Sequence, residues 1–239
     1  MPPAQLARHL DLANHHADST PPDIHRLCQK VIQYGFNSAF VNPSYVSFIR
    51  ENYHLKLKIG TVISFPLGQD VLDIKAAAAK RALVDGADEL DISLDIGQLK
   101  TELARSIPPD QSRSLYDMKS LVDITKSFSS GKIIKFIIET GYLTPAEAAS
   151  ASLLVLASGA DFVKTDSGLG PRGATIDDIL TIRKAVGNKI RIKAAGGIET
   201  YHQAMDLIKA GADRLGTSHA VEIITQAPPA ADQPSSASE

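Results

Sequence analysis

GADELDISL, residues Gly86–Leu94, contains the pattern that decides the fold. The same tripeptide opens GADFVKT (Gly159–Thr165) and GADRLGT (Gly211–Thr217). Each copy follows a stretch with helical character and precedes a short run of apolar residues. Glycine suits the left-handed backbone position at which many helices end. Each copy therefore predicts a junction from a helix into a strand, and we assign it a structural role.

Outward from these junctions, apolar runs that predict strands alternate with longer helical patterns. Strands are predicted at 37–42, 58–64, 88–95, 132–139, 161–165, 189–194 and 214–217, with a weaker one at 9–13. Helical patterns occupy 21–34, 44–53, 71–85, 114–129, 144–158, 175–186, 199–210 and 218–225. Eight strand–helix units predict an α/β protein with a (β/α)8 TIM barrel. A doubly wound open sheet is the competing interpretation, because strand order is not visible in a sequence.

Two segments interrupt this alternation. Residues 98–116 contain Pro108, Pro109 and many polar side chains, which predicts a long loop or a frayed helix. Residues 226–239 are rich in Pro, Ala and Ser and are expected to form a disordered tail. Since no linker interrupts the rest of the chain, we expect a single barrel domain over residues 1–225.

Composition narrows the classes of function. The 239 residues include 25 Lys and Arg and 27 Asp and Glu, a balance that disfavours nucleic acid or a membrane surface as partner. No apolar run is long enough to predict a membrane-spanning helix. One cysteine, Cys28, excludes a disulfide framework, and no signal-peptide pattern is present, so we expect a cytoplasmic protein. The histidine spacing predicts no metal site, and no dinucleotide or Walker motif predicts a cofactor.

Alternation along the predicted strand at 88–95 separates its side chains into two faces. Glu89, Asp91, Ser93 and Asp95 should face the barrel interior or its rim, whereas the apolar positions between them should face the helices. A buried carboxylate needs a partner or a chemical role. On this pattern alone, an interior salt bridge and a functional site are equally open.

The same alternation directs several basic side chains into the barrel. Lys164 and Lys193 lie near the carboxyl ends of their strands, and Lys135 and Arg191 share the inward parity. A desolvated lysine beside another cation has a lowered pKa, and its neutral amine can form a Schiff base with a carbonyl. An inward aspartate can then move protons, directly or through water. Sequence position leaves open which lysine is the nucleophile.

The loops after the seventh and eighth predicted strands favour phosphate binding. They read Gly196–Thr200 and Gly216–His219, and both combine glycine with hydroxyl-bearing residues. Barrels of this kind often bind phosphate on backbone N–H groups at these two positions. Ordinary turns with helix N-caps are the alternative interpretation.

These motifs resemble those of the deoxyribose-phosphate aldolases. FVKTDSG (Phe162–Gly168) resembles the Schiff-base strand of that family, RIKAAGGI (Arg191–Ile198) its second-lysine strand, and GADELDISLDIG (Gly86–Gly97) its aspartate strand. FVNPSYV (Phe40–Val46) and KFIIETGYLT (Lys135–Thr144) extend a resemblance that covers roughly residues 9–225. The resemblance implies a class I aldolase without metal or other cofactor. The implied reaction is reversible cleavage of 2-deoxy-D-ribose 5-phosphate to glyceraldehyde 3-phosphate and acetaldehyde.

The resemblance also implies roles for individual residues. Lys164 would form the Schiff base, Lys193 would lower its pKa, and Asp91 would take part in proton transfer through an ordered water. Asp11 would support the second lysine. The implied partner is a phosphorylated sugar or aldehyde, and a homo-oligomer is implied as well. The residues implied in substrate and phosphate binding are Gly197, Gly216, Ser218, Ser167 and Asp166.

Several positions depart from the family pattern. Asp166 stands where a serine is usual, Phe40 where a cysteine is usual, and Ala13 and Asn14 replace a threonine and a leucine. The tail has no tyrosine, although some family members end in a catalytic one. We hypothesise that Asp166, Phe40 and Asn14 together adjust the substrate preference. An Asp166 carboxylate pointing at the active site would raise the pKa of Lys164.

Two alternative functions stay open. One is a lyase or transaldolase-like enzyme of the same fold acting on a different sugar phosphate. The other is a non-catalytic barrel that binds a sugar phosphate. Retention of Lys164, Lys193 and Asp91 favours an enzyme, because a barrel that had lost catalysis would be expected to lose one of them.

Overall fold

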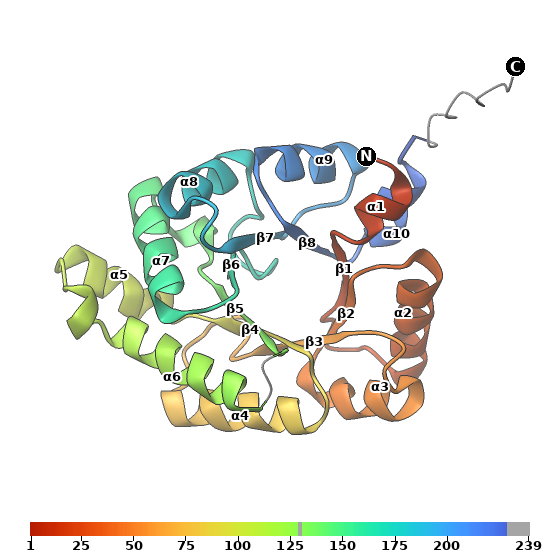
Figure 1. The fold of residues 1–239 in the computed structure, drawn as a ribbon, viewed down its shortest axis with the longest axis horizontal. Coiled ribbons are helices and arrows are strands. Elements are labelled where there is room, and N and C mark those ends of the chain that lie inside the picture. Colours follow the sequence, from red (N-terminus) through yellow and green to blue (C-terminus); the bar gives the residue numbers. More distant parts are fainter. Residues whose placement is uncertain (129–130, 229–239) are drawn as a thin grey trace, which may run out of the picture.

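The computed structural model describes residues 1–128 and 131–228, which form a closed barrel of parallel strands in chain order (Figure 1). β8 pairs with β1 to close the barrel. This arrangement confirms the (β/α)8 prediction and excludes the doubly wound sheet. The strands are β1 (Leu10–Asn14), β2 (Ser38–Val41), β3 (Ile59–Ile63), β4 (Glu89–Ser93), β5 (Ile133–Ile137), β6 (Phe162–Lys164), β7 (Arg191–Ala195) and β8 (Arg214–Thr217).

Helices surround the barrel on the outside (Figure 1). None in the described part of the chain combines the length and apolar character that a membrane span requires. The helices are α1 (Pro3–Ala7), α2 (Pro21–Tyr34), α3 (Val46–Tyr53), α4 (Leu72–Val84), α5 (Ile96–Ala104), α6 (Arg113–Phe128), α7 (Pro145–Ser158), α8 (Ile176–Val186), α9 (Tyr201–Ala210) and α10 (Ala220–Thr225). Three 3₁₀ turns accompany them: η1 (Pro43–Tyr45), η2 (Pro109–Gln111) and η3 (Thr140–Tyr142).

The segment at 98–116 differs from its prediction as a long loop or frayed helix. It contains most of α5 and the η2 turn. Asp95, expected to face the barrel interior or its rim, lies just after β4 and caps α5 by accepting a hydrogen bond from the Gln98 N–H. The buried Glu102 carboxylate accepts one from the Ser112 hydroxyl at 2.7 Å. The polar residues that suggested a loop therefore stabilise a helix and its connection to the next. Of the predicted tail at 226–239, residues 229–239 lie outside the described residues.

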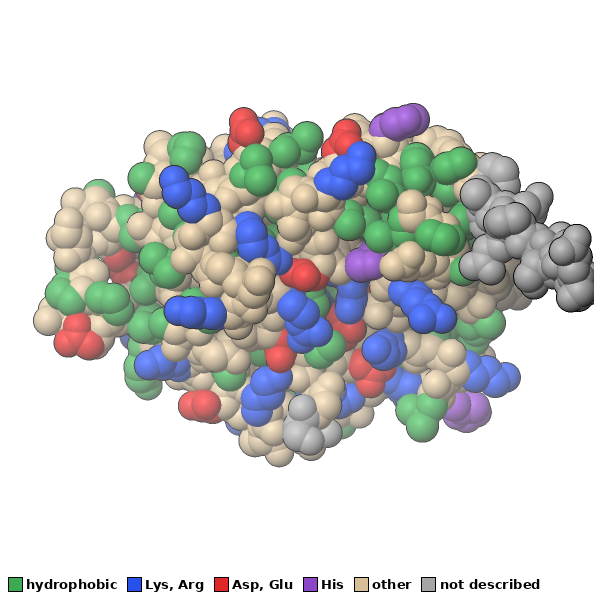
Figure 2. Space-filling model, turned by 45° about the horizontal axis from the view of Figure 1, so that its top comes forward, with side chains coloured by type: hydrophobic (Ala, Val, Ile, Leu, Met, Phe, Trp, Pro, Cys, Tyr) green, Lys and Arg blue, Asp and Glu red, His purple; other side chains and the backbone are tan. Residues whose placement is uncertain are grey.

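The layer between the strands and the helices is apolar. Leu90, Ile92, Val163 and Ile192 are fully buried on the helix-facing side of their strands. Each side chain of this size stabilises the fold by about 1.5–3 kcal/mol when it is buried. Cys28 also lies in this layer, where burial raises the pKa of its thiol to about 12. Basic and acidic side chains are interspersed on the outer face that Figure 2 shows, as expected from the balanced composition.

The Gly-Ala-Asp junctions have the predicted structural role. Gly86, Gly159 and Gly211 adopt φ values of 105°, 83° and 116°, which favour glycine. Each aspartate then accepts a hydrogen bond from a backbone N–H of the neighbouring strand and pairs with a basic side chain of a helix. The three sets are Asp88 with Ile59 and Arg50, Asp161 with Ile134 and Lys126, and Asp213 with Ile192 and Arg183. These sets fasten the rim of the barrel at which the strands begin.

Candidate active site

The barrel interior holds a set of buried ionisable side chains, which we call the interior charge cluster. Each member lies within 2.9 Å of a group of opposite charge, as buried charges require. Its three carboxylates and four basic groups give a formal charge of +1 when all are ionised. The members are Asp11, Glu89, Asp91, Lys135, Lys164, Lys193 and Arg214.

Asp91 joins the three lysines of this cluster. Its Oδ2 atom lies 2.9 Å from the Nζ atoms of Lys164 and Lys193, and its Oδ1 atom lies 2.9 Å from that of Lys135. Burial would raise the pKa of Asp91, but the three lysines outweigh it and hold the pKa well below its usual range. Asp91 therefore stays ionised at neutral pH.

Lys135 lies in the sealed part of the cluster. Its Nζ atom is 2.6 Å from Glu89, and the rings of Phe40 and Phe162 cover it with centroids 4.8 and 5.5 Å away. Burial would lower the pKa of Lys135, but Asp91 and Glu89 outweigh it and raise the pKa. Lys135 therefore stays charged.

The pKa of Lys164 shifts in the opposite direction to that of Lys135. Lys164 is the last residue of β6 and lines a pocket, although only 3% of it is exposed. Burial lowers its pKa, and the charges of Lys193 and Lys135 lower it further against the attraction of Asp91. When Lys164 loses its proton, the interior charge cluster reaches formal neutrality. The neutral amine therefore forms more easily here than on a lysine in water.

Asp11 and Asp91 hold Lys193 between them. The Asp11 Oδ2 atom is 2.8 Å from Lys193 Nζ, and its Oδ1 atom accepts hydrogen bonds from Arg214 at 2.9 Å and Ser38 at 2.6 Å. Burial would raise the pKa of Asp11, but Lys193 and Arg214 keep it below its usual range. Asp11 is fully buried and does not line the pocket, but it contacts the pocket-lining Lys193 directly.

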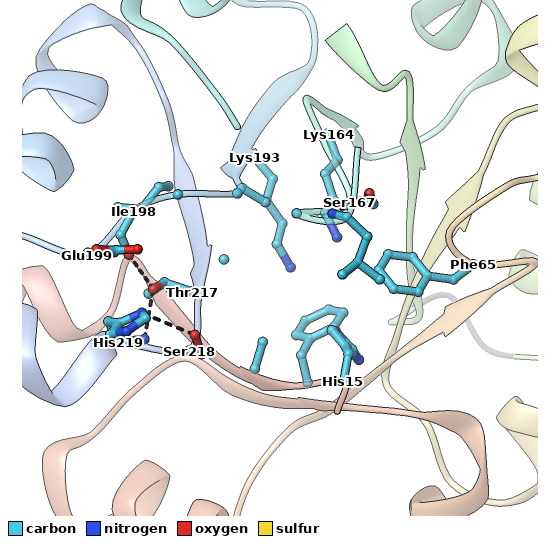
Figure 3. Close-up of a pocket in the computed structure, with 18 of the residues that line it drawn as sticks. His15, Phe65, Lys164, Ser167, Lys193, Ile198, Glu199, Thr217, Ser218 and His219 are labelled. Atoms are coloured by element: carbon cyan, nitrogen blue, oxygen red, sulfur yellow. Dashed lines mark hydrogen bonds between the residues drawn. The ribbon is translucent and has the colours of Figure 1, made fainter. Parts of the chain in front are cut away.

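The pocket has a volume of about 300 Å³ and opens where the strands end (Figure 3). Lys164 and Lys193 both line it, and Ser218 lies away from Lys164 on the side formed by the last two strand–helix loops. A Cβ atom at Gly216 would lie 2.9 Å from Lys193 Cε, so a larger residue there would displace the end of the Lys193 side chain. Four of the residues expected to bind substrate or phosphate line this pocket: Gly197, Gly216, Ser218 and Ser167.

Asp166 is placed differently from its expectation. Its carboxylate accepts hydrogen bonds from the Thr140 hydroxyl at 2.9 Å and the Gly141 N–H at 3.1 Å, and it is not among the pocket-lining residues. Burial raises its pKa to about 6. Because β6 ends at Lys164, strand alternation no longer determines where Asp166 points. The carboxylate expected to raise the pKa of Lys164 instead faces the loop after β5.

Phe40 and Asn14, two other departures from the family pattern, differ in their relation to the pocket. Phe40 is 1% exposed and lines the pocket, and its ring centroid lies 3.5 Å from Lys193 Nζ. Gly60 leaves room for that ring, because a Cβ atom at this position would lie 2.2 Å from ring atoms of Phe40. Asn14 lies outside the pocket lining and accepts a hydrogen bond from the Ser19 hydroxyl at 2.8 Å.

Arg191 does not point into the barrel as predicted. Its side chain is 49% exposed and its guanidinium lies 4.1 Å from the Phe162 ring centroid. Arg191 is the first residue of β7, at the rim opposite the pocket. A long side chain at this end of the barrel reaches water, so alternation alone misplaced it.

Several other pocket residues were not predicted, among them His15 and Phe65. Each follows closely after the end of a strand, β1 and β3 respectively. Position at the carboxyl end of a barrel strand is the signal that would have identified them.

The comparisons with known proteins agree with this geometry. A family model described as DeoC/LacD family aldolase matches residues 7–220. The chain is 42% identical to a deoxyribose-phosphate aldolase of Thermococcus kodakarensis, over 94% of this chain and 97% of the relative. It is 40% identical to one of Caldicellulosiruptor saccharolyticus, over 93% and 98% of the two chains.

Solved structures give the same result. A structure titled "QR15, an Aldolase" superposes with a TM-score of 0.83 at 31% identity and covers 92% of this chain and 94% of its own. A tetrameric deoxyribose phosphate aldolase from Aeropyrum pernix superposes with a TM-score of 0.81 at 29% identity, over 93% and 91% of the two chains. With its buried lysines at the mouth of a (β/α)8 barrel, this chain belongs to the DeoC/LacD family of aldolases.

Proposed function

We propose that the protein reversibly cleaves 2-deoxy-D-ribose 5-phosphate to D-glyceraldehyde 3-phosphate and acetaldehyde through a Schiff base on Lys164. The main support is the setting of Lys164, a pocket-lining amine whose pKa is lowered by burial and by neighbouring lysines. The names of the similar proteins supply the substrate of the proposal.

The first step of the proposed reaction joins substrate and enzyme. The neutral Nζ atom of Lys164 attacks C1 of the open-chain aldehyde, and the resulting carbinolamine loses water to give a protonated imine. Lys193 favours the neutral amine before attack, because its own charge lies beside the same Asp91 oxygen. Asp91 orients both amines and, with a water, conducts the proton that the carbinolamine oxygen needs in order to leave.

The second step breaks the C2–C3 bond. The C3 hydroxyl loses its proton, its oxygen becomes the carbonyl of glyceraldehyde 3-phosphate, and the bond electrons move into the imine to form an enamine. Protonation at C2 and hydrolysis then release acetaldehyde and regenerate Lys164. Because the pKa of Asp91 is so low, Asp91 acts in these transfers by holding a water rather than by storing a proton.

The phosphate of the substrate is assigned to the loops after β7 and β8. Gly197 and Gly216 allow close approach to the backbone there, and Ser218 offers a hydroxyl. Ser167, from the loop after β6, lines the same pocket nearer to Lys164. Backbone N–H groups and hydroxyls are a common phosphate-binding combination in such barrels.

Borohydride reduction in the presence of acetaldehyde tests the proposal. Reduction should fix one ethyl group on the protein, and peptide mass spectrometry should locate it at Lys164. A protein that binds deoxyribose 5-phosphate without forming an adduct would be the non-catalytic alternative. An adduct combined with preference for another sugar phosphate would favour the transaldolase-like alternative.

We also propose that the protein forms a homo-oligomer. Leu153 on α7 and Ile176 and Leu180 on α8 are 46–51% exposed on two helices that pack against each other. The structure from Aeropyrum pernix is described as a tetramer. Light scattering coupled to size-exclusion chromatography should give a mass above that of one chain, and a monomer at micromolar concentration would contradict this part of the proposal.

A further inference from the structure

His15 is a pocket residue that the proposed reaction does not use. It follows β1 directly, and its ring lies against Phe65 with the centroids 5.2 Å apart. Lys164 Nζ lies 5.8 Å from the centroid of the same Phe65 ring. Figure 3 shows His15 and the two lysines directed toward one space from different sides. A ligand held on Lys164 would therefore pass close to His15.

The two ring nitrogens of His15 differ in their surroundings. Nδ1 is enclosed by protein and makes no hydrogen bond within the described residues, although the Asn42 side chain interacts with the ring. Nε2 is not among the enclosed atoms without a partner, so we assign the ligand to this nitrogen. An enclosed polar atom without a partner costs about 1–3 kcal/mol of stability. A ligand at Nε2 does not relieve this cost at Nδ1; what points to a ligand is the position of the imidazole in the pocket wall, in front of Lys164.

The charge state of His15 limits what it can bind. Burial and the positive charges of Lys164 and Lys193 lower its pKa to about 4, against the smaller effects of Asp91 and Asn42. At neutral pH the ring is uncharged and offers one N–H donor and one bare nitrogen acceptor. An uncharged ring suits a neutral hydroxyl better than a phosphate dianion.

We propose that His15 hydrogen-bonds the C4 hydroxyl of the sugar chain and thereby makes the enzyme selective for acceptor aldehydes that carry a hydroxyl beside the carbonyl. This inference rests on the proposed function, which places C1 on Lys164 and the phosphate on the loops after β7 and β8. Between these ends lie two hydroxyls, of which the C3 hydroxyl reacts. The C4 hydroxyl needs a partner that does not take part in proton transfer at C3, and His15 stands apart from the interior charge cluster.

The test compares two acceptors that differ by one hydroxyl. Each is condensed with acetaldehyde: D-glyceraldehyde 3-phosphate, and 3-oxopropyl phosphate, which lacks only that hydroxyl. Wild-type enzyme should prefer glyceraldehyde 3-phosphate in kcat/KM by about tenfold, the value of one hydrogen bond. His15→Leu should reduce this preference to about twofold or less, while His15→Gln, which keeps a donor and an acceptor, should retain most of it.

Both rates are measured on the same preparation, so a partly unfolded variant lowers them equally and leaves their ratio intact. His202→Leu is the control: it removes an exposed imidazole on α9 that does not line the pocket, and it should keep the wild-type ratio. A His15→Leu enzyme that keeps the wild-type ratio, or loses both rates equally, overturns the role of His15. Wild-type enzyme that condenses neither acceptor overturns the proposed function itself.

Discussion

Lys135 on β5 and Lys164 on β6 are neighbouring buried lysines that contact the same carboxylate, yet their pKa values shift in opposite directions. Both are penalised by burial. Lys135 has a second carboxylate, Glu89, at 2.6 Å and aromatic rings over it. Lys164 has a second cation, Lys193, bound to the same Asp91 oxygen, and it opens onto the pocket.

The difference teaches that burial alone does not produce a reactive lysine. Burial lowers the pKa of any lysine, but the nearest charges decide the final direction. The sealed side of the cluster pairs its lysine with two acids, which suits a structural role. The open side makes two lysines share one oxygen, which leaves one amine poorly paired and able to lose its proton.

The largest effect should come from Lys164→Ala. Loss of the proposed nucleophile should reduce kcat by at least about 10⁴-fold, as removal of other covalent nucleophiles does. Binding of inorganic phosphate, measured by calorimetry, should change little because the proposed phosphate contacts come from other loops. Normal turnover in this variant would move the nucleophile to Lys193 or Lys135.

Lys135→Met tests the structural half of the comparison. It leaves Glu89 and part of Asp91 without their nearest cation in a sealed site, which should destabilise the protein by about 3–5 kcal/mol. Denaturant unfolding would measure the loss. A variant as stable as wild type would mean that the sealed part of the cluster is not needed for folding.

Lys193→Met tests why the pKa of Lys164 is lowered. In the proposed mechanism the neutral amine of Lys164 is the reactive form, so kcat/KM should rise as the pH rises through the pKa of Lys164. Removing Lys193 removes a repelling charge and leaves Asp91 freer to stabilise the Lys164 ammonium. The rising limb of the pH profile should move to higher pH, with activity at neutral pH falling about tenfold or more. A limb that stays in place while kcat falls would give Lys193 a different role.

Asp166→Asn should have the smallest effect, and on stability rather than chemistry. The pKa of Asp166 is raised to about 6 from 3.8, so between these pH values the folded protein binds more protons than the unfolded chain. Stability is therefore lost as the pH rises through this window. Asparagine removes this titration, so the free energy of unfolding of the variant relative to wild type should be about 2 kcal/mol higher at pH 8 than at pH 4.

Unfolding midpoints in denaturant at the two pH values would measure this difference. A gain that is larger at pH 4 than at pH 8 would reverse the sign and contradict the burial effect. If Asp166→Ser instead changes the preference between deoxyribose 5-phosphate and other sugars, the hypothesis that Asp166 adjusts specificity would be supported despite its position outside the pocket.

Sequence patterns predicted the barrel because period-two alternation and the helix-ending glycines are local signals. The same alternation placed Asp91, Lys135, Lys164 and Lys193 in the interior. It could not predict which groups meet, because Asp91 contacts lysines 44, 73 and 102 residues away. Those contacts depend on the register between strands, which the local sequence does not contain.

The wrong predictions concern residues at or beyond the ends of strands, where side-chain alternation no longer holds. Arg191 and Asp166 lie at the start of one strand and beyond the end of another, where a side chain is free to turn. The helix α5 was predicted only as a long loop or a frayed helix, because its capping and connecting residues are polar and resemble those of a loop. His15 was missed because a single loop residue carries no periodicity.

The Gly-Ala-Asp sets have a practical consequence for redesigning this enzyme. They join β3 to β4, β5 to β6 and β7 to β8 at the rim where the strands begin, whereas the pocket is lined by residues at the opposite ends of the strands. The contacts that hold neighbouring strands together and the residues that line the pocket therefore lie at opposite ends of the barrel. A mutant library confined to the loops after β1, β6, β7 and β8 can change the accepted aldehyde and leave all three Gly-Ala-Asp sets intact.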